Sequence, residues 1–111
     1  MIIIDESQLL KGILEGTVLS VISRGETYGY EILLVLNRYG FKDIYEGTLY
    51  PILTRMEKKD IISCRTAKSP LGPKRKYYTI TKSGEKYYEE FKKVFIEITS
   101  KTNEIINTRD L

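Results

Sequence analysis

The chain has 111 residues, 41% of them hydrophobic and 30% charged, which fits one globular domain and excludes a disordered or low-complexity protein. It has no apolar run of the roughly 18 residues that a membrane span needs, and its first residues do not show the basic start and cleavage site typical of a signal peptide. It also has no histidine and one cysteine, so we expect a cytoplasmic protein without metal or cofactor. The net charge of +3 is unevenly distributed, because residues 55–77 contain eight basic and two acidic residues.

The first predicted helix spans about Ser7 to Ser23, because apolar residues recur there at intervals of three and four. Ser7 is the expected N-cap of this helix. A second helix is expected from Thr27, which is placed to cap it, to about Tyr39. Gly40 then supplies the left-handed residue that ends many helices.

A third helix is predicted from about Glu46 to Asp60, with four apolar residues on its inner face. Pro51 is comfortable only near a helix start, so the regular hydrogen-bond ladder should begin no earlier than Gly47. The predicted outer face carries Thr48, Tyr50, Arg55 and Lys59.

Two β-favouring runs follow at residues 61–66 and 76–80, separated by a loop rich in proline and glycine. This pattern indicates an antiparallel hairpin. Three helices followed by a basic hairpin are typical of a winged helix-turn-helix. We therefore predict a mainly α (α+β) fold in which the hairpin forms a two-stranded wing.

A long helix is predicted from Thr81, because apolar residues there keep spacings close to those of a coiled-coil seam. About 25 helical residues extend nearly 40 Å, which is more than this small domain can cover, so a second copy is the simplest partner. We expect residues 1–80 to form the winged-helix domain and residues 81–111 the dimerisation helix, in one compact unit. The expected dimer interface is Leu10, Ile13, Leu14, Tyr87, Phe91, Val94, Ile98 and Ile105.

The basic stretch at residues 55–77 fits a surface that binds DNA phosphates, although a solvated hairpin would carry the same charge. Thr48 and Tyr50 offer hydroxyls to phosphates or base edges; alternatively, Thr48 is an N-cap and Tyr50 packs on the wing. Arg55 lies nearly two turns further on and is expected to reach a phosphate. Tyr30, at the start of the second helix, fits a phosphate contact or core packing equally well.

Three consecutive cations, Lys74, Arg75 and Lys76, lie where the wing returns. Strand alternation places Lys74 and Lys76 on one face and Arg75 on the other. We expect them to bind backbone phosphate or to enter the minor groove, with a solubilising hairpin tip as the alternative. Alternation likewise predicts that one of Tyr77 and Tyr78 is core and the other partly exposed.

Four sequence blocks occur in the order of these elements. They are Leu10-Lys11-Gly12, Tyr28-Gly29-Tyr30-Glu31-Ile32, Glu46-Gly47-Thr48-Leu49-Tyr50-Pro51 and Gly72-Pro73-Lys74-Arg75-Lys76-Tyr77-Tyr78, followed by Thr81 and Gly84. Over about residues 9–95 the chain resembles the PadR family of transcriptional regulators, in its short subgroup with one C-terminal helix. The resemblance implies a homodimer on double-stranded DNA, most often a repressor that a ligand releases. A two-fold dimer would read a pseudo-palindromic operator.

In short drug-sensing members of that family, an aromatic residue at the position of Phe95, usually tryptophan, stacks flat ligands at the dimer centre. This chain has no tryptophan. Phe91 and Phe95 lie one helical turn apart, so they fit either a dimer core or a site for a small planar aromatic effector, and ligand-free repression stays open. Cys64, near Arg65, is either inert packing or a redox-reactive thiol.

Enzyme chemistry is not expected, because the sequence lacks histidine and any paired carboxylate or nucleophile–base motif. The serious alternative to a DNA-binding regulator is a winged-helix protein–protein interaction module without DNA binding, since a fold alone does not fix function. The basic segment and the block at residues 46–51 favour DNA.

Overall fold

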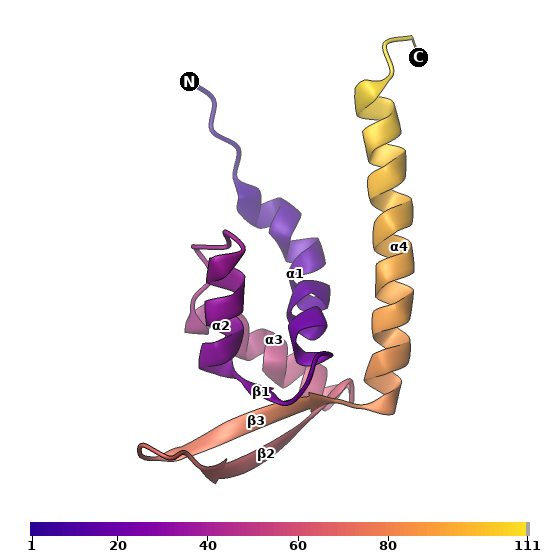
Figure 1. Cartoon of the computed structure of the whole chain (residues 1–111). Helices are drawn as coiled ribbons and strands as arrows, with labels where there is room; N and C mark the ends of the chain where they lie inside the picture. Colours follow the sequence, from indigo (N-terminus) through magenta and orange to yellow (C-terminus); the bar gives the residue numbers. More distant parts are fainter. Residues whose placement is uncertain (111) are drawn as a thin grey trace.

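Within residues 1–110, which the computed structural model of the chain describes, four helices and three strands follow one another along the chain (Figure 1). In chain order they are α1 (Glu6–Ile22), β1 (Thr27–Tyr28), α2 (Gly29–Arg38), α3 (Glu46–Lys58), β2 (Ile62–Lys68), β3 (Lys74–Ile80) and α4 (Lys82–Asn107). The predicted winged-helix arrangement of three N-terminal helices, a hairpin and a long C-terminal helix is confirmed.

The sheet is antiparallel, with strand order β1-β3-β2. β1 extends the predicted two-stranded wing along the free edge of β3, where Thr27 pairs with Tyr78 and Tyr28 with Tyr77. The prediction that Thr27 caps the second helix is therefore wrong: α2 begins one residue later, with Tyr28 as its N-cap. Thr27 is buried, and its hydroxyl donates to Glu31 Oε1 at 2.6 Å.

The N-cap of α1 is Asp5 rather than the predicted Ser7. Asp5 Oδ1 accepts hydrogen bonds from the Ser7 hydroxyl at 2.6 Å and from the Ser7 backbone N–H at 3.0 Å. Both bonds lower the pKa of Asp5, the hydroxyl bond most. A carboxylate also complements the positive end of the helix dipole, which favours a start before Ser7.

The helix α3 differs from its prediction at both ends. Its hydrogen-bond ladder begins at the Tyr45 carbonyl, which accepts from the Leu49 N–H at 3.0 Å, so the expected later start is wrong. Pro51 is the sixth residue of α3, and it has no N–H to donate to the carbonyl of the exposed Gly47. The helix ends at Lys58, short of the predicted Asp60, which has a left-handed φ of 60°.

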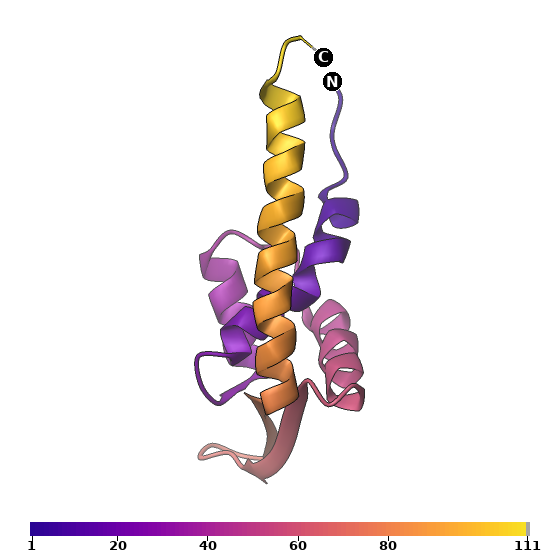
Figure 2. The same cartoon turned by 90° about the vertical axis from the view of Figure 1, so that its right-hand side faces the viewer.

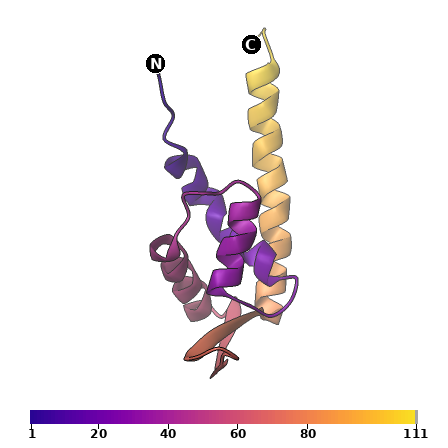
Figure 3. The ribbon, with the colours of Figure 1, turned by 60° about the vertical axis from the view of Figure 1, so that its left-hand side comes forward.

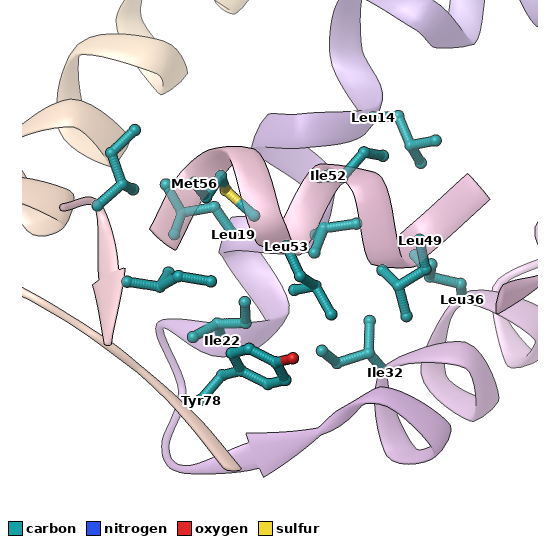
Figure 4. Packing of buried hydrophobic residues seen from close by; sticks show 13 residues of the cluster. Leu14, Leu19, Ile22, Ile32, Leu36, Leu49, Ile52, Leu53, Met56 and Tyr78 are labelled. Atoms are coloured by element: carbon teal, nitrogen blue, oxygen red, sulfur yellow. The ribbon is translucent and has the colours of Figure 1, made fainter. Parts of the chain in front are cut away.

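The hydrophobic core lies where α1, α2 and α3 meet the sheet (Figure 4). Ile22, Ile32, Leu53 and Met56 are fully buried there. Tyr78 closes the core from β3 and is 3% exposed, whereas Tyr77 is half-buried, which confirms the predicted alternation. The core fixes how α3 sits relative to α2 and the wing.

The helix α4 rises from the end of β3 beside α1, and its C-terminal part extends beyond the other elements (Figures 1 and 2). In Figure 3 the sheet lies beneath the helices, so α4 and the wing point in different directions. The helix begins at Lys82, one residue after the predicted start, and Thr81 is its N-cap, whose hydroxyl accepts from the Gly84 N–H at 2.9 Å. None of the helices within residues 1–110 has the length and hydropathy of a membrane span.

Candidate nucleic-acid interface

The face of α3 opposite the core is fully accessible. At about 100° per residue, Gly47, Pro51, Thr54 and Lys58 lie along its centre, and all four are exposed. Thr54 and Lys58 were absent from the predicted outer face. The buried residues Leu49, Ile52, Leu53 and Met56 define the inner direction, so the same 3.6-residue period could have identified both.

Thr48 lies on one flank of this face. It is the third residue of α3 and its N–H donates to the Tyr45 carbonyl at 3.0 Å, so the alternative that Thr48 is the N-cap is wrong. Its side chain is exposed, which leaves the hydroxyl accessible to a partner molecule.

Tyr50 lies on the opposite flank, 41% exposed. Its hydroxyl lies against Gly29 at the start of α2, where a Cβ atom would be 2.6 Å from the hydroxyl oxygen. Tyr30, one residue further along α2, is 61% exposed, so the core-packing alternative for Tyr30 is wrong. Two tyrosines from α2 and α3 therefore border the same surface.

An open groove of about 440 Å³ lies between the start of α2, α3 and the wing. Its lining includes five residues that the sequence selected for DNA contact: Tyr30, Tyr50, Lys74, Arg75 and Lys76. Residues separated by up to 46 positions are brought together here because β3 pairs with β1, which leads directly into α2. The groove is bordered by hydroxyls and cations, which suits a phosphodiester backbone.

The wing residues alternate as predicted. Lys74 and Lys76 are exposed, whereas Arg75 is half-buried on the other face. The guanidinium carbon of Arg75 lies 4.0 Å from the centroid of the Tyr28 ring, a cation–π contact that ties the wing to β1. Lys74 and Lys76 are thus the freer cations of this trio.

A second cation on the same face of the sheet extends this contact. Arg65 donates to both carboxylate oxygens of Glu26 at 2.7 Å and lies 4.7 Å from the Tyr77 ring centroid. The rings of Tyr77 and Tyr28 meet edge to face at 5.8 Å. The bonds from Arg65 lower the pKa of Glu26. Sequence reasoning missed this row of stacked side chains, because the β1–β3 and β2–β3 registers are both needed to place its members together.

Arg55 is not part of the groove. Its Nε atom lies 3.5 Å from Glu15 Oε2 on α1, so the side chain is directed to the α1 flank of α3. The Tyr87 hydroxyl of α4 donates to Glu15 Oε1 at 3.2 Å. Glu15 was not selected from the sequence, in which nothing marks it among the other acidic residues.

The residues predicted for a dimer interface form an apolar surface on α4 and α1. Tyr87, Val94, Ile98 and Ile105 are between 39% and 60% exposed, and Leu10 and Ile13 are half-buried. Leu14 differs, because it is 5% exposed and packs within the core of the protomer, which leaves it almost no surface for a partner.

Phe91 and Phe95 stack on this surface, with ring centroids 5.9 Å apart and an interplanar angle of 27°. The Phe91 ring packs directly on Gly16 of α1, in space that any side chain at position 16 would occupy. Phe95 is 38% exposed. Phe91 therefore belongs to the α1–α4 contact, and Phe95 is the more accessible of the two rings.

Cys64 is half-buried on β2, opposite Tyr78. Burial raises the pKa of its thiol, and the charge of Glu57 raises it further. The charge of Lys76 lowers this pKa, but by less than burial and Glu57 raise it, and the Arg65 guanidinium is turned to the other face of the sheet, toward Glu26. A protonated thiol is a poor nucleophile, which favours packing over redox sensing.

The helices α2 and α3, beside a basic antiparallel wing, define the winged-helix class of DNA-binding folds. Residues 18–90 match the model of the transcriptional regulator PadR-like family. The chain therefore belongs to the PadR-like family of transcriptional regulators, which are DNA-binding proteins and not enzymes.

Solved structures support this assignment. A PadR-like transcriptional regulator from Bacillus cereus is 45% identical, with a TM-score of 0.83 over 93% of this chain and 100% of the other. A Streptococcus transcriptional regulator is 42% identical, with a TM-score of 0.80 over 90% of this chain and 98% of the other. An uncharacterised protein of Lysinibacillus sphaericus is 37% identical over 94 residues, which are 83% of this chain and 86% of that relative.

Proposed function

We propose that this chain is a sequence-specific transcriptional repressor that binds a pseudo-palindromic operator as a homodimer. The observation that carries the proposal is the groove that gathers Tyr30, Tyr50, Lys74 and Lys76 from three elements beside the exposed face of α3. Here α3 enters the major groove, while the wing binds the adjacent backbone or minor groove.

Within this proposal, Thr48, Tyr50 and Thr54 are the contacts to base edges or nearby phosphates. Lys58, Lys74 and Lys76 neutralise phosphates, which supplies the salt-dependent part of the affinity. Arg75 and Arg65 instead hold the wing in position through their stacking on Tyr28 and Tyr77. A wing that is ordered before binding loses less conformational entropy when it meets DNA.

Dimerisation through α4 is supported by its unpartnered apolar face. Ile98 and Ile105 are 58% and 60% exposed on a helix of 26 residues that extends past the protomer core. An open cleft of about 1430 Å³, lined by residues that include Leu10 and Phe91, runs between the N-terminal segment, α1, α3 and α4. A second α4 offers the apolar surface that would cover the part of this cleft next to α1 and α4, where Leu10 and Phe91 lie, and would leave the exposed face of α3 free for DNA.

In this proposal the two parts of the chain have different roles. Residues 1–80 bind DNA, and residues 81–111 bring two such units together.

A small planar aromatic effector would stack on Phe95 near the dimer axis and shift the spacing of the two α3 helices. The stacked, partly exposed rings of Phe91 and Phe95 support this site.

The proposal is tested by fluorescence polarisation with labelled DNA from upstream of the protein's own gene, measured over a series of salt concentrations. We expect nanomolar binding that weakens with salt. The double variant Lys74→Gln/Lys76→Gln should reduce the salt slope by about 0.9 for each phosphate that it no longer neutralises. Lys101→Gln, on the distal part of α4, is the matched control and should leave the slope unchanged. Indifference of the wild type to such fragments at every salt concentration would favour a protein-interaction module instead.

A further inference from the structure

One carboxylate of α1 connects α3 with α4. The two oxygens of Glu15 have different partners: Oε2 lies 3.5 Å from Arg55 Nε on α3, and Oε1 accepts from the Tyr87 hydroxyl on α4 at 3.2 Å. The Glu15 side chain is 19% exposed, whereas that of Arg55 is 53% exposed. Glu15 is thus the fixed member of the ion pair, and Arg55 is the member that solvent or a ligand can reach.

The position of Glu15 is set by α4. The next residue, Gly16, packs directly under the Phe91 ring, so the backbone of α1 contacts α4 immediately beside the Glu15 side chain. Phe91 lies one helical turn after Tyr87, and both contacts therefore come from the same face of α4. Burial, followed by the charge of Glu15, raises the pKa of Tyr87, which keeps its hydroxyl protonated as a donor.

The position of Arg55 on α3 makes its partner important for DNA binding. Arg55 follows Thr48 by seven residues and lies on the same flank of the exposed face. A long guanidinium side chain on that flank can turn either to the carboxylate of α1 or to a phosphate of a bound duplex. It cannot satisfy both anions in full, so Glu15 and a phosphate compete for it.

We propose that Glu15 is a positioning residue that holds Arg55 away from DNA phosphates, and that the Tyr87 hydroxyl fixes Glu15 in this role. The inference rests on the proposed DNA-binding function and adds a link between α4 and α3. A shift of α4 that moves Tyr87 changes where the Glu15 carboxylate lies. It thereby changes how readily Arg55 can turn to a DNA phosphate. The link runs through one protomer, and its Tyr87 belongs to the proposed dimer surface, so an event at that surface can reach Arg55 through Glu15.

The test is a double-mutant cycle on operator binding, with polarisation measured across salt concentrations and folding checked by circular dichroism. Glu15→Gln keeps the side-chain shape but removes the charge, so Arg55 turns to a phosphate. We expect binding about five- to tenfold tighter near 0.1 M salt and a slope steeper by about 0.9, the signature of one more neutralised phosphate. Arg55→Met alone should have little effect, and Glu15→Gln should lose its effect in the Arg55→Met background.

Glu57→Gln is the matched control, because Glu57 is an exposed acid on α3 itself. It removes the same charge, and its effect on affinity should be the same with or without Arg55. Tyr87→Phe, which changes no charge, should shift the slope in the direction of Glu15→Gln by a smaller amount. An unchanged slope in Tyr87→Phe would overturn the part assigned to Tyr87.

Weaker binding by Glu15→Gln, or an effect that persists in the Arg55→Met background, would overturn the proposal. These outcomes are separate from a failure of the proposed function, in which the wild-type protein itself binds no upstream DNA.

Discussion

The hydroxyl of Tyr50 lies so close to the backbone of Gly29 that a Cβ atom there would be 2.6 Å from the hydroxyl oxygen and 3.0 Å from Cζ of the ring. This contact joins the start of α2 to the exposed flank of α3. It explains why a residue without a side chain stands between Tyr28, which stacks on Arg75, and Tyr30, which borders the groove. The small residue lets Tyr50 lie across the helix-turn-helix.

Gly29→Ala should therefore displace the Tyr50 ring and weaken DNA binding while the fold persists, because the ring end is at the surface and can move. We expect roughly a tenfold loss of affinity, equivalent to about 1.4 kcal/mol. The double variant Gly29→Ala/Tyr50→Phe relieves the contact with the hydroxyl and should recover part of any decrease in thermal stability. An affinity equal to that of the wild type would show that the placement of Tyr50 is irrelevant to DNA.

Tyr50→Ala tests the side chain itself. We expect operator binding to weaken by about 1–3 kcal/mol, as for a specific contact, with no change in oligomeric state by light scattering. Tyr39→Ala is a suitable control, because Tyr39 is 72% exposed at the far end of α2. If both variants bind like the wild type, Tyr50 has only a structural role.

Gly16→Ala tests the contact between α1 and α4. The added methyl group overlaps the Phe91 ring, so we expect a decrease of about 1–3 kcal/mol in the free energy of unfolding, measured with denaturant. Gly12→Ala, in the same helix, is the control: nothing lies within 4 Å of a Cβ atom there. That change should stabilise the protein by about 0.5–1 kcal/mol through helix propensity. Equal effects of the two variants would contradict the close packing of Phe91.

Local sequence patterns were sufficient to predict the four helices and the hairpin, because apolar spacing and cap or stop residues mark the helices, and β-favouring runs around a loop of proline and glycine mark the hairpin. It could not predict β1, since Thr27 and Tyr28 make only a two-residue strand whose existence depends on pairing with β3. The capping errors have the same origin. Ser7 and Thr27 are residue types that commonly cap helices. Asp5 caps α1 instead of Ser7, and Thr27 is a strand residue because it pairs with Tyr78.

Some residues of the candidate site could be predicted from the sequence and others could not, for a related reason. Tyr50 and Lys74 lie in sequence blocks with recognisable composition, whereas Glu15 and Arg65 act through partners 40 and 39 residues away. A charged residue whose partner is distant in sequence carries no local signal. The fold has to be known before such pairs can be identified.

Cys64 should react slowly with thiol reagents. Its raised pKa means that the thiolate is scarce at pH 7 to 8 and increases only as the pH rises above the usual thiol range. We expect alkylation by iodoacetamide to be markedly slower in the folded protein than in denaturant at the same pH, with the rate increasing up to alkaline pH. Mass spectrometry gives the rate at this single cysteine. Rapid modification of the folded protein at pH 7 would instead support a redox role.

Truncation after Gly84 tests the contribution of α4. Such a chain keeps the N-cap bond from Gly84 to Thr81 but lacks Tyr87 and Phe91, so α1 is left without its packing partner. We expect a monomeric or unfolded product by light scattering and circular dichroism, because the apolar face that joins two copies is also removed. Truncation after Asn107 removes only residues beyond the helix and should behave like the full chain. A stable dimer of the shorter product would place the interface elsewhere on the winged-helix unit and remove α4 from the proposed assembly.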